Sequence, residues 1–251
     1  MCLAVALQGP ANEFTMTIQT KEQLAQYFDH TLLDCMATED DIRHHCQEAV
    51  EHGFYAVCVQ PRWVKLCADV LSGSGVKVVS VAGFPYGTET SRVKALEADA
   101  VIMDGADEVD IVADLASVIA GDANYLRADF EAVLKVCRGV LPSVPLKVII
   151  ESAALTPDQI RFVCEIAQQA GVDFLKTSTG FHTAGGAQVE DVKLMAEAAP
   201  RCKIKAAGGI KTVQQTLAFI EAGVSRIGAS ASVQIIEEFN TRVAIDGNDA
   251  T

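Results

Sequence analysis

The chain has 251 residues, of which 50% are apolar and 21% are charged, a composition typical of a globular protein. Thirty-three acidic against twenty basic residues give a net charge of −13, which disfavours nucleic acids and anionic membranes as partners, since both are bound mainly through clustered Lys and Arg. No apolar run reaches the roughly 18 residues that a membrane-spanning helix needs.

Short β-branched runs alternate with longer helical patterns along most of the chain. The predicted strands lie at 28–33, 55–59, 77–83, 108–113, 146–151, 173–178, 203–208 and 226–230. The predicted helices lie at 38–52, 61–72, 90–103, 122–141, 156–170, 189–199, 212–222 and 231–239. Two helices carry start signals, since Thr38 precedes a run of acidic residues and Thr156 precedes Pro157.

These strand–helix pairs predict an α/β protein built as a single (β/α)8 TIM barrel. Strands rich in Val and Ile that alternate with helices indicate a parallel sheet buried on both faces. Eight such units within about 210 residues, without a linker, fit a closed barrel. An open doubly wound sheet is the alternative, but no GxGxxG motif follows the first strand. We expect one domain over 17–240, with loose tails at 1–16 and 241–251.

The cysteines and the start of the chain bear on cellular location. Eight cysteines are scattered without a CxxC pair, mostly in apolar runs, so we expect reduced thiols in a cytoplasmic protein. The opening MCLAVALQGP lacks basic residues, so a signal peptide is not expected. Met16 is an alternative start of the protein.

An internal repeat places four chemically distinct residues at one level of alternate strands. Each even-numbered strand follows a glycine, as expected where a helix ends just before a strand, and these are Gly53, Gly105, Gly171 and Gly223. Five residues after each glycine stand Cys58, Asp110, Lys176 and Gly228. Because side chains of alternate strands share a layer inside such a barrel, this layer is the candidate site. Cys58 lacks an evident base, so we expect it to line the pocket rather than to act as a nucleophile.

Lys176, in VDFLKTSTG, is the leading candidate for chemistry. A lysine within a buried strand is costly unless it is deprotonated, paired or used, and barrel active sites lie at the carboxyl ends of the strands. The alternative is a strand-end lysine that reaches solvent. Lys205, in KIKAAGGI, ends the next strand, about 4.8 Å away. Two cations in one pocket disfavour each other's protonation, which leaves a free amine for attack on a carbonyl.

The carboxylates of the strands are candidate partners for these lysines. Asp110 stands between two β-branched apolar residues and therefore requires a cation, although Glu108 faces the same way and is an alternative partner. For Asp29, in the first strand, catalysis and structural hydrogen bonding are equally open. Lys205 could instead bind phosphate, and Lys203 belongs either to the same charge cluster or to the end of the barrel.

Glycine-rich loops after the sixth, seventh and eighth strands supply a candidate anion site. They are STG at 178–180, AGG at 207–209 and GASAS at 228–232. Glycines let backbone N–H groups approach a ligand, and Ser230 heads the last helix, whose dipole favours an anion. Barrels often hold phosphate at the loops after strands seven and eight.

The five histidines do not predict a metal site. His44, His45 and His52 lie on one acidic helix, with no strand-borne carboxylate at ligand spacing. His30 and His182 are closer to the expected mouth of the barrel, but neither forms a metal-ligand motif.

Together these segments resemble deoxyribose-phosphate aldolases, a family of class I Schiff-base aldolases. The resemblance runs from about Leu24 to Phe239 and rests on DHTLL, CVQPRWV, VAGFPYG, GADEVDIV, LKVIIE, FLKTSTGF, KAAGGIKT and RIGAS. FLKTSTG and KAAGGI at this separation are highly specific. The resemblance implies a barrel that reversibly cleaves 2-deoxy-D-ribose 5-phosphate to D-glyceraldehyde 3-phosphate and acetaldehyde, without a metal or other cofactor. The expected partner is a small sugar phosphate, with no nucleic acid and no membrane, and a homodimer is retained as an option.

The resemblance also implies roles for individual residues. Lys176 would form the Schiff base, and Lys205 and Asp110 would transfer protons. The substrate-binding candidates are Asp29, Cys58, Thr179, Gly180, Gly208, Gly209, Gly228 and Ser230. Relatives often carry a second serine where this chain has Ala231, a difference that concerns phosphate affinity and not the chemistry.

Three other functions are alternatives. They are a Schiff-base aldolase or transaldolase acting on a different sugar phosphate, a metal-dependent aldolase, and a catalytically silent barrel that binds sugar phosphates. Borohydride trapping of an iminium on Lys176 would distinguish an enzyme from a binding protein. Activity that resists EDTA would remove the metal-dependent enzyme.

Overall fold

Eight parallel strands close into a barrel in the computed structural model, which describes residues 18–248 and, for 243–248, the backbone alone. The strands are β1 (Phe28–Leu32), β2 (Ala56–Val59), β3 (Lys77–Ala82), β4 (Glu108–Val112), β5 (Leu146–Ile149), β6 (Phe174–Lys176), β7 (Lys203–Ala207) and β8 (Arg226–Ala229). Each strand pairs with the next in chain order, and β8 pairs with β1. The predicted (β/α)8 barrel is confirmed.

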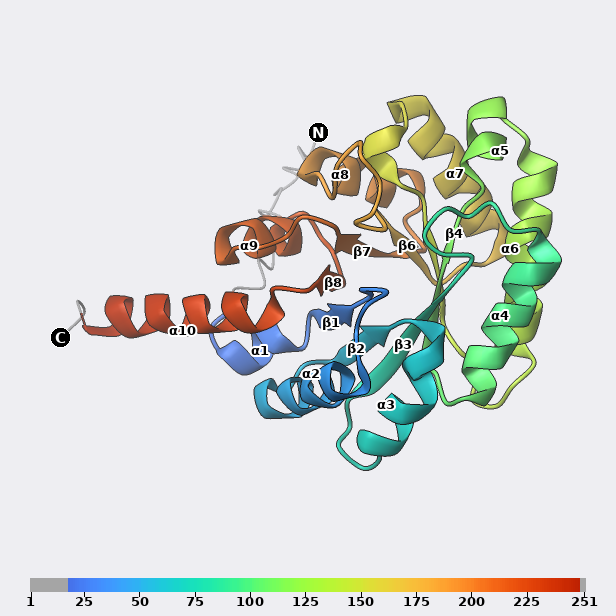
Figure 1. Cartoon of the computed structure of the whole chain (residues 1–251). Helices are drawn as coiled ribbons and strands as arrows, with labels where there is room; N and C mark the ends of the chain where they lie inside the picture. The colour runs from blue at the N-terminus through green and yellow to red at the C-terminus, as the bar shows by residue number, and fades with distance from the viewer. Residues whose placement is uncertain (1–17, 249–251) are drawn as a thin grey trace, which may run out of the picture.

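Helices cover the outer face of this barrel (Figure 1). They are α1 (Lys21–Ala25), α2 (Glu39–His52), α3 (Val64–Val70), α4 (Ser91–Met103), α5 (Leu115–Ala120), α6 (Ala123–Arg138), α7 (Pro157–Ala170), α8 (Val189–Ala198), α9 (Val213–Glu221) and α10 (Ser232–Asn248). Two short 3-10 turns, Pro61–Trp63 and Ser152–Ala154, precede α3 and α7. Among the residues described, no helix is both long enough and apolar enough to cross a bilayer.

The structure differs from the sequence prediction at three helices. The short helices α1 and α5 were not predicted. Helix α10 continues to Asn248, past the expected end at 239 and into the tail expected at 241–251. No proline interrupts this stretch, and Arg242 pairs with Glu238 one turn earlier at 2.5 Å, which supports continued helix. Residues 1–16 and 249–251 of the predicted tails lie outside the described residues.

The predicted helix boundaries follow from capping. Thr38 accepts a hydrogen bond from the backbone N–H of Asp41, whose side chain reaches back to the Thr38 N–H, and Thr156 begins α7 in the same way. Gly53 and Gly171 end α2 and α7 in the left-handed region, with φ of 66° and 90°. These caps set where each following strand begins, and therefore which side chains face the barrel interior.

The apolar core has two parts. The larger part fills the space between the barrel and its helices. A smaller cluster inside the barrel occupies the side formed by β1–β3 and consists of Leu33, Ala56, Cys58, Val79 and Val81. The remaining interior, toward β4–β8, carries charged side chains instead.

A buried ion pair lies outside the barrel, between α4 and α6. The Lys94 ammonium donates to Asp129 at 2.7 Å and to the carbonyl oxygen of Val112 at 2.9 Å, and neither charged side chain is exposed. A Cβ built on Gly83 would lie 2.9 Å from Cγ of Lys94, so glycine makes room for the lysine stem.

We expect Asp129→Ala to lower the free energy of unfolding by about 3–5 kcal/mol, because it leaves the Lys94 charge buried without a partner. Urea unfolding at neutral pH measures this loss. The matched control is Asp69→Ala, which breaks the exposed pair with Lys65 and should cost at most about 1 kcal/mol. Equal losses in the two variants would contradict this reading of the buried pair.

Candidate functional site

Seven charged side chains meet inside the barrel, and we call them the charge cluster. Its members come from β1 and from β4–β8 and are all buried; they are Asp29, Glu108, Asp110, Lys147, Lys176, Lys205 and Arg226. Register explains why they meet, since Asp110 pairs laterally with Lys147 and Lys176 with Lys205. Laterally paired residues of parallel strands point to the same face of the sheet.

The Asp110 carboxylate is the centre of this cluster. Its Oδ1 accepts a hydrogen bond from Lys147 at 2.7 Å, and its Oδ2 accepts one from Lys176 and one from Lys205, each at 2.9 Å. Burial alone would raise the pKa of Asp110, but the three ammonium groups outweigh burial and hold the pKa well below its usual value. Asp110 is therefore an anion at neutral pH.

Lys205 is held by a second carboxylate. Its ammonium also donates to Asp29, which in turn accepts from Arg226 at 2.7 Å. Burial opposes both charges, yet the cations lower the pKa of Asp29 to about 2, and the carboxylates raise the pKa of Lys205. Lys205 is thus protonated and fixed between two anions.

Lys147 is held in a similar way on the other side of Asp110. It contacts Glu108 at 2.6 Å, and burial, which would lower its pKa, is outweighed by Asp110 and Glu108, which raise it. Tyr55 donates to Glu108 at 3.2 Å, and the Arg226 guanidinium lies 3.4 Å from the centre of the Tyr55 ring. Glu108, considered as an alternative partner of the two predicted lysines, pairs instead with Lys147 and, at 3.6 Å, with Arg226.

A cavity of about 510 Å³ opens above the cluster at the carboxyl ends of the strands. Of the predicted site residues it is lined by Lys176, Thr179, Gly180, Gly208, Gly209, Gly228 and Ser230. Among the described lining residues, Lys176 bears the one basic side chain. Residues of the loops after β6, β7 and β8 therefore line the same cavity as Lys176.

The other predicted residues lie behind this cavity. Asp110 contacts Lys176, and Lys205 contacts Asp110, but neither Asp110 nor Lys205 lines the cavity. Asp29, left open between two roles, is hydrogen-bonded to Lys205 and Arg226 and is not among the lining residues. Cys58 is fully buried in the apolar cluster, where burial raises the pKa of its thiol.

Gly228 leaves space for the side chain of Lys205 inside the barrel. A Cβ at this position would lie 3.1 Å from Cε of Lys205 and 3.1 Å from Cβ of Ala207. A larger residue would thus push the lysine stem away from its two carboxylates.

Three residues of the site were not predicted from the sequence. Lys147 and Arg226 complete the charge cluster, and Lys147 carried the same signal as Lys176, a lysine within an apolar strand. Glu151 follows β5 with a φ of 54°, and its carboxylate accepts from the hydroxyl of Thr179 at 2.6 Å and from the Thr179 N–H at 3.3 Å. A residue with a left-handed backbone and a buried carboxylate thereby positions the loop after β6, and no spacing in the sequence reveals this contact.

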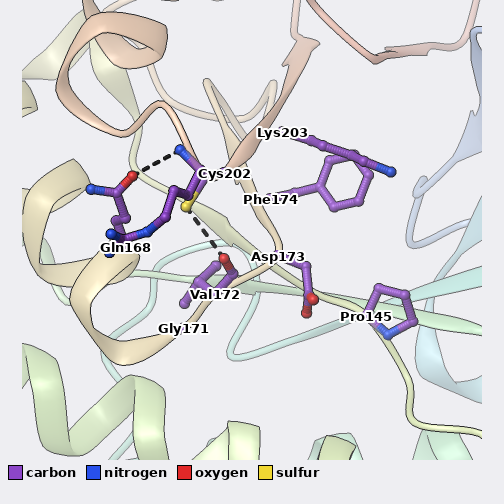
Figure 2. A pocket seen from close by; sticks show the side chains of 9 residues that line it. Pro145, Gln168, Gly171, Val172, Asp173, Phe174, Cys202 and Lys203 are labelled. Carbon is purple, nitrogen blue, oxygen red and sulfur yellow. Dashed lines mark hydrogen bonds between the residues drawn. The ribbon is translucent and has the colours of Figure 1, made fainter.

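Lys203 belongs to the opposite end of the barrel. It lines a separate cavity of about 390 Å³ with Phe174 and Asp173, and Figure 2 shows its side chain alongside the Phe174 ring. Its ammonium lies 5.4 Å from the ring centre. Of the two alternatives for this residue, the structure supports the end-of-barrel lysine.

Comparison with known proteins identifies similar chains. The family model described as DeoC/LacD family aldolase matches residues 23–235. The deoxyribose-phosphate aldolase of Thermococcus gammatolerans is 49% identical over 217 residues, covering 85% of this chain and 95% of the relative. That of Deinococcus radiodurans is 50% identical over 214 residues, with the same coverage of each chain. The tetrameric structure of the deoxyribose-phosphate aldolase from Aeropyrum pernix, 31% identical, superposes with a TM-score of 0.82 over 89% of this chain and 93% of that one.

We expect Lys147→Met to lower the free energy of unfolding by about 3–5 kcal/mol at neutral pH, because it removes a buried cation from two carboxylates. The depressed pKa of Asp110 gives stability that is present above the unfolded value of about 3.9 and lost as pH falls. The pKa of Asp110 is less depressed in the variant, so the deficit should be full at neutral pH and shrink as pH falls below about 4, toward the folded pKa of Asp110.

Urea unfolding across this pH range measures the deficit, with Lys203→Met as the control that removes a lysine outside the charge cluster. A deficit that does not change with pH, or an equal deficit in Lys203→Met, would show that Lys147 does not sustain the Asp110 anion.

Proposed function

Because the chain belongs to the DeoC/LacD family of aldolases, we propose that it is a class I aldolase that reversibly cleaves 2-deoxy-D-ribose 5-phosphate to D-glyceraldehyde 3-phosphate and acetaldehyde. One observation carries this proposal. The buried charge cluster contains four cationic side chains, and of these only Lys176 lines the cavity. An amine in a cavity, with acid–base groups beside it, is what Schiff-base chemistry requires.

The contacts within the cluster separate Lys176 from the other two lysines. Lys147 and Lys205 each contact two carboxylates, whereas Lys176 contacts a single oxygen of Asp110 that it shares with Lys205. Loss of a proton from Lys176 leaves no carboxylate without a cation. Lys176 is therefore the nucleophile in this proposal.

The reaction follows from a neutral Lys176 amine. The amine adds to the aldehyde carbon of the open-chain sugar, and loss of water gives an iminium. The hydroxyl on the third carbon loses its proton, the bond between the second and third carbons breaks, and the electron pair passes into the iminium to form an enamine. Glyceraldehyde 3-phosphate leaves at this step. Protonation of the enamine carbon and hydrolysis of the new iminium release acetaldehyde and restore the amine.

Asp110 and Lys205 are positioned to move the protons of these steps. The Asp110 carboxylate lies 2.9 Å from the Lys176 nitrogen and accepts from Lys205 through the same oxygen. Lys205 is a protonated donor and Asp110 an anionic acceptor, so the pair can pass a proton to and from the cavity, with water carrying it to the substrate.

The phosphate is assigned to the loops after β6, β7 and β8. Apart from Lys176, the described residues that line the cavity carry no basic side chain, so an anion there depends on backbone N–H groups and hydroxyls. Ser230 lines the cavity just before α10, whose N-terminal dipole favours negative charge. This local site works against the chain's net charge of −13.

The cysteines support the cytoplasmic location predicted from the sequence. Within the described residues, seven cysteines are free thiols, and all but Cys35 are buried. Buried thiols of this kind act as small apolar side chains and need no oxidising compartment.

We expect Lys176→Arg to abolish cleavage of 2-deoxy-D-ribose 5-phosphate, because a guanidinium stays protonated and cannot add to a carbonyl. Release of acetaldehyde, coupled to its reduction by an alcohol dehydrogenase, measures turnover. Urea unfolding verifies that the variant is folded, and Lys203→Arg, at the far end of the barrel, is the control that should keep activity. Retention of a tenth of the activity or more would move the Schiff base to another lysine, with Lys205 the first to test.

Replacing Ser230 with Asp should raise KM for 2-deoxy-D-ribose 5-phosphate by roughly tenfold while changing KM for unphosphorylated deoxyribose much less, because like charges repel at the start of α10. Ser230→Asn is the neutral control of similar size. Steady-state kinetics with both substrates measure the split. Equal increases for the two substrates would place the phosphate elsewhere.

A further inference from the structure

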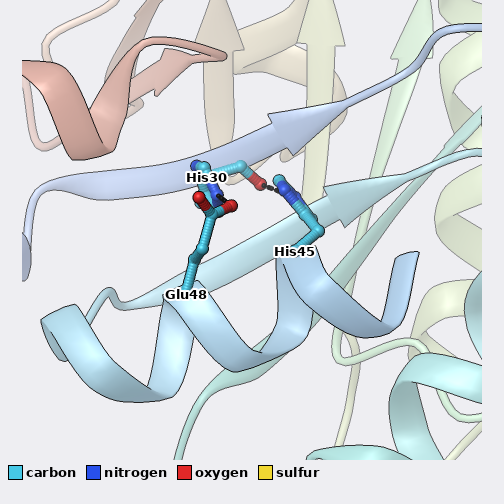
Figure 3. Close-up of side chains that lie close together, drawn as sticks. All are labelled: His30, His45 and Glu48. Atoms are coloured by element: carbon cyan, nitrogen blue, oxygen red, sulfur yellow. Dashed lines mark hydrogen bonds and ion pairs between the residues drawn. The ribbon is translucent and has the colours of Figure 1, made fainter. Parts of the chain in front are cut away.

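Two histidines and a glutamate meet outside the barrel wall, between β1 and α2 (Figure 3). His30 follows the inward-facing Asp29 on β1, so its side chain points outward, toward α2. His45 and Glu48 rise from α2 toward it. One ligand atom from each of the three residues lies within 4.8 Å of the other two. The sequence did not suggest this group, since His30 and His45 are on different elements.

The hydrogen bonds of this group show which ring nitrogens carry a proton. Nε2 of His45 lies 3.0 Å from the His30 carbonyl oxygen, which can only accept, so the His45 proton is on Nε2 and Nδ1 keeps its lone pair. Nε2 of His30 lies 3.1 Å from Oε2 of Glu48, a carboxylate oxygen that can only accept, so His30 donates through Nε2, and among the residues described its buried Nδ1 has no partner. His30 would therefore bind an ion through Nε2 in its other tautomer, with the proton on Nδ1.

The group adjoins a cavity that suits a cation. This cavity, of about 420 Å³, is also lined by Asp34 and Asp41, whose carboxylates give it a negative potential. The Glu48 side chain is 28% exposed, so the carboxylate can be reached from the cavity. His44, one residue from His45, places its Nε2 3.5 Å from the other Glu48 oxygen and offers a further ligand.

We propose that His30, His45 and Glu48 bind a divalent transition-metal ion of the Zn²⁺, Co²⁺ and Ni²⁺ group, with His44 or water in the remaining position. Two imidazoles and one carboxylate are ligands that these ions prefer, whereas Ca²⁺ and Mg²⁺ prefer all-oxygen sites. The 3.1 Å between His30 Nε2 and Glu48 Oε2 is close to the roughly 3.3 Å between two ligands at about 2.0–2.1 Å from a tetrahedral ion.

Binding requires a movement of His45. Its ring is stacked on that of His30, with 3.8 Å between centres and 22° between planes. Nitrogen lone pairs lie in the plane of the ring, so two stacked imidazoles cannot both point at one ion. His45 must turn toward the cavity, away from the His30 carbonyl, before the third ligand closes on the metal.

The site is separate from the Schiff-base chemistry. It lies behind β1, on the side opposite to Asp29, but its cavity shares Thr31, Leu32, Asp34 and Ser230 with the active-site cavity. An ion there would connect α2 to β1 and stabilise the folded chain without contacting the reacting atoms. The proposal therefore holds or fails independently of the aldolase activity.

The test is metal binding by the full chain with Cys2 and Cys35 replaced by serine, so that neither thiol competes for the metal. We expect one equivalent of Co²⁺ to give the intense visible bands of a tetrahedral site, and Zn²⁺ to displace it. Zn²⁺ at about a hundredfold above its Kd should raise the unfolding midpoint by roughly 5–10 °C. His45→Phe, which keeps the ring stack, and Glu48→Gln should each weaken binding by roughly tenfold or more.

His52→Phe, on the same helix but outside the group, is the matched control and should bind like the parent protein. If the parent does not bind Co²⁺ or Zn²⁺, the proposal is wrong. It is equally wrong if His44→Ala abolishes binding while His45→Phe retains it, because the ion would then sit on the exposed His44–Glu48 pair. Should His45→Phe fail to fold, His44→Ala keeps the test decisive, since binding that survives this change does not rest on the exposed His44–Glu48 pair.

Discussion

A single carboxylate, that of Asp110, is sealed inside a β-barrel with three ammonium groups hydrogen-bonded to it. An isolated buried anion would be very costly, so the lysines and the carboxylate depend on one another. Together with Asp29, Glu108 and Arg226 they form a cluster of four cationic side chains and three carboxylates. This excess of one cation matters, because the lysine at the cavity can give up its proton while every carboxylate keeps a partner. The barrel thus holds a reactive amine without leaving a buried charge uncompensated.

This arrangement is possible because each charged side chain of the cluster comes from a rigid strand. Lys176 and Lys205 are lateral neighbours, and Asp110 is two strands from Lys176. Sites built on strands hold their geometry better than sites built on loops, and the loops here add the anion site above. A buried cluster of ions is a weak source of stability, so the apolar layer between barrel and helices must supply most of it. Gly228 and Glu151 serve the same geometry, the first by leaving room for Lys205 and the second by holding Thr179.

The sequence predicts the barrel well because the fold depends on local signals. Val- and Ile-rich strands, threonine N-caps and glycine C-caps repeat along the chain, and each is readable within about ten residues. Asp110 and Lys176 were found in the same way, since charged residues within apolar strands are conspicuous. Lys147 gives the same local signal, but its carboxylate partners, Glu108 and Asp110, follow only from the pairing of β5 with β4.

Partners that depend on register or on tertiary packing could not be predicted. The sequence left Asp29 open between two roles, and only the closure of β1 against β8 brings it to Arg226 and Lys205. The electrostatic expectation for Lys205 was also incomplete. The positive charge of Lys205 is balanced by Asp29 as well as by Asp110. Lys205 therefore does not act on Lys176 as an uncompensated positive charge.

The most direct measurement is reduction of the reaction mixture with borohydride, followed by peptide mapping. With 2-deoxy-D-ribose 5-phosphate present, an iminium on a lysine becomes a stable secondary amine, and mass spectrometry locates the modified residue. We expect one substrate-dependent modification, on the peptide that carries Lys176. Modification of Lys147 or Lys205 instead, or no substrate-dependent modification while the protein turns over, would contradict it.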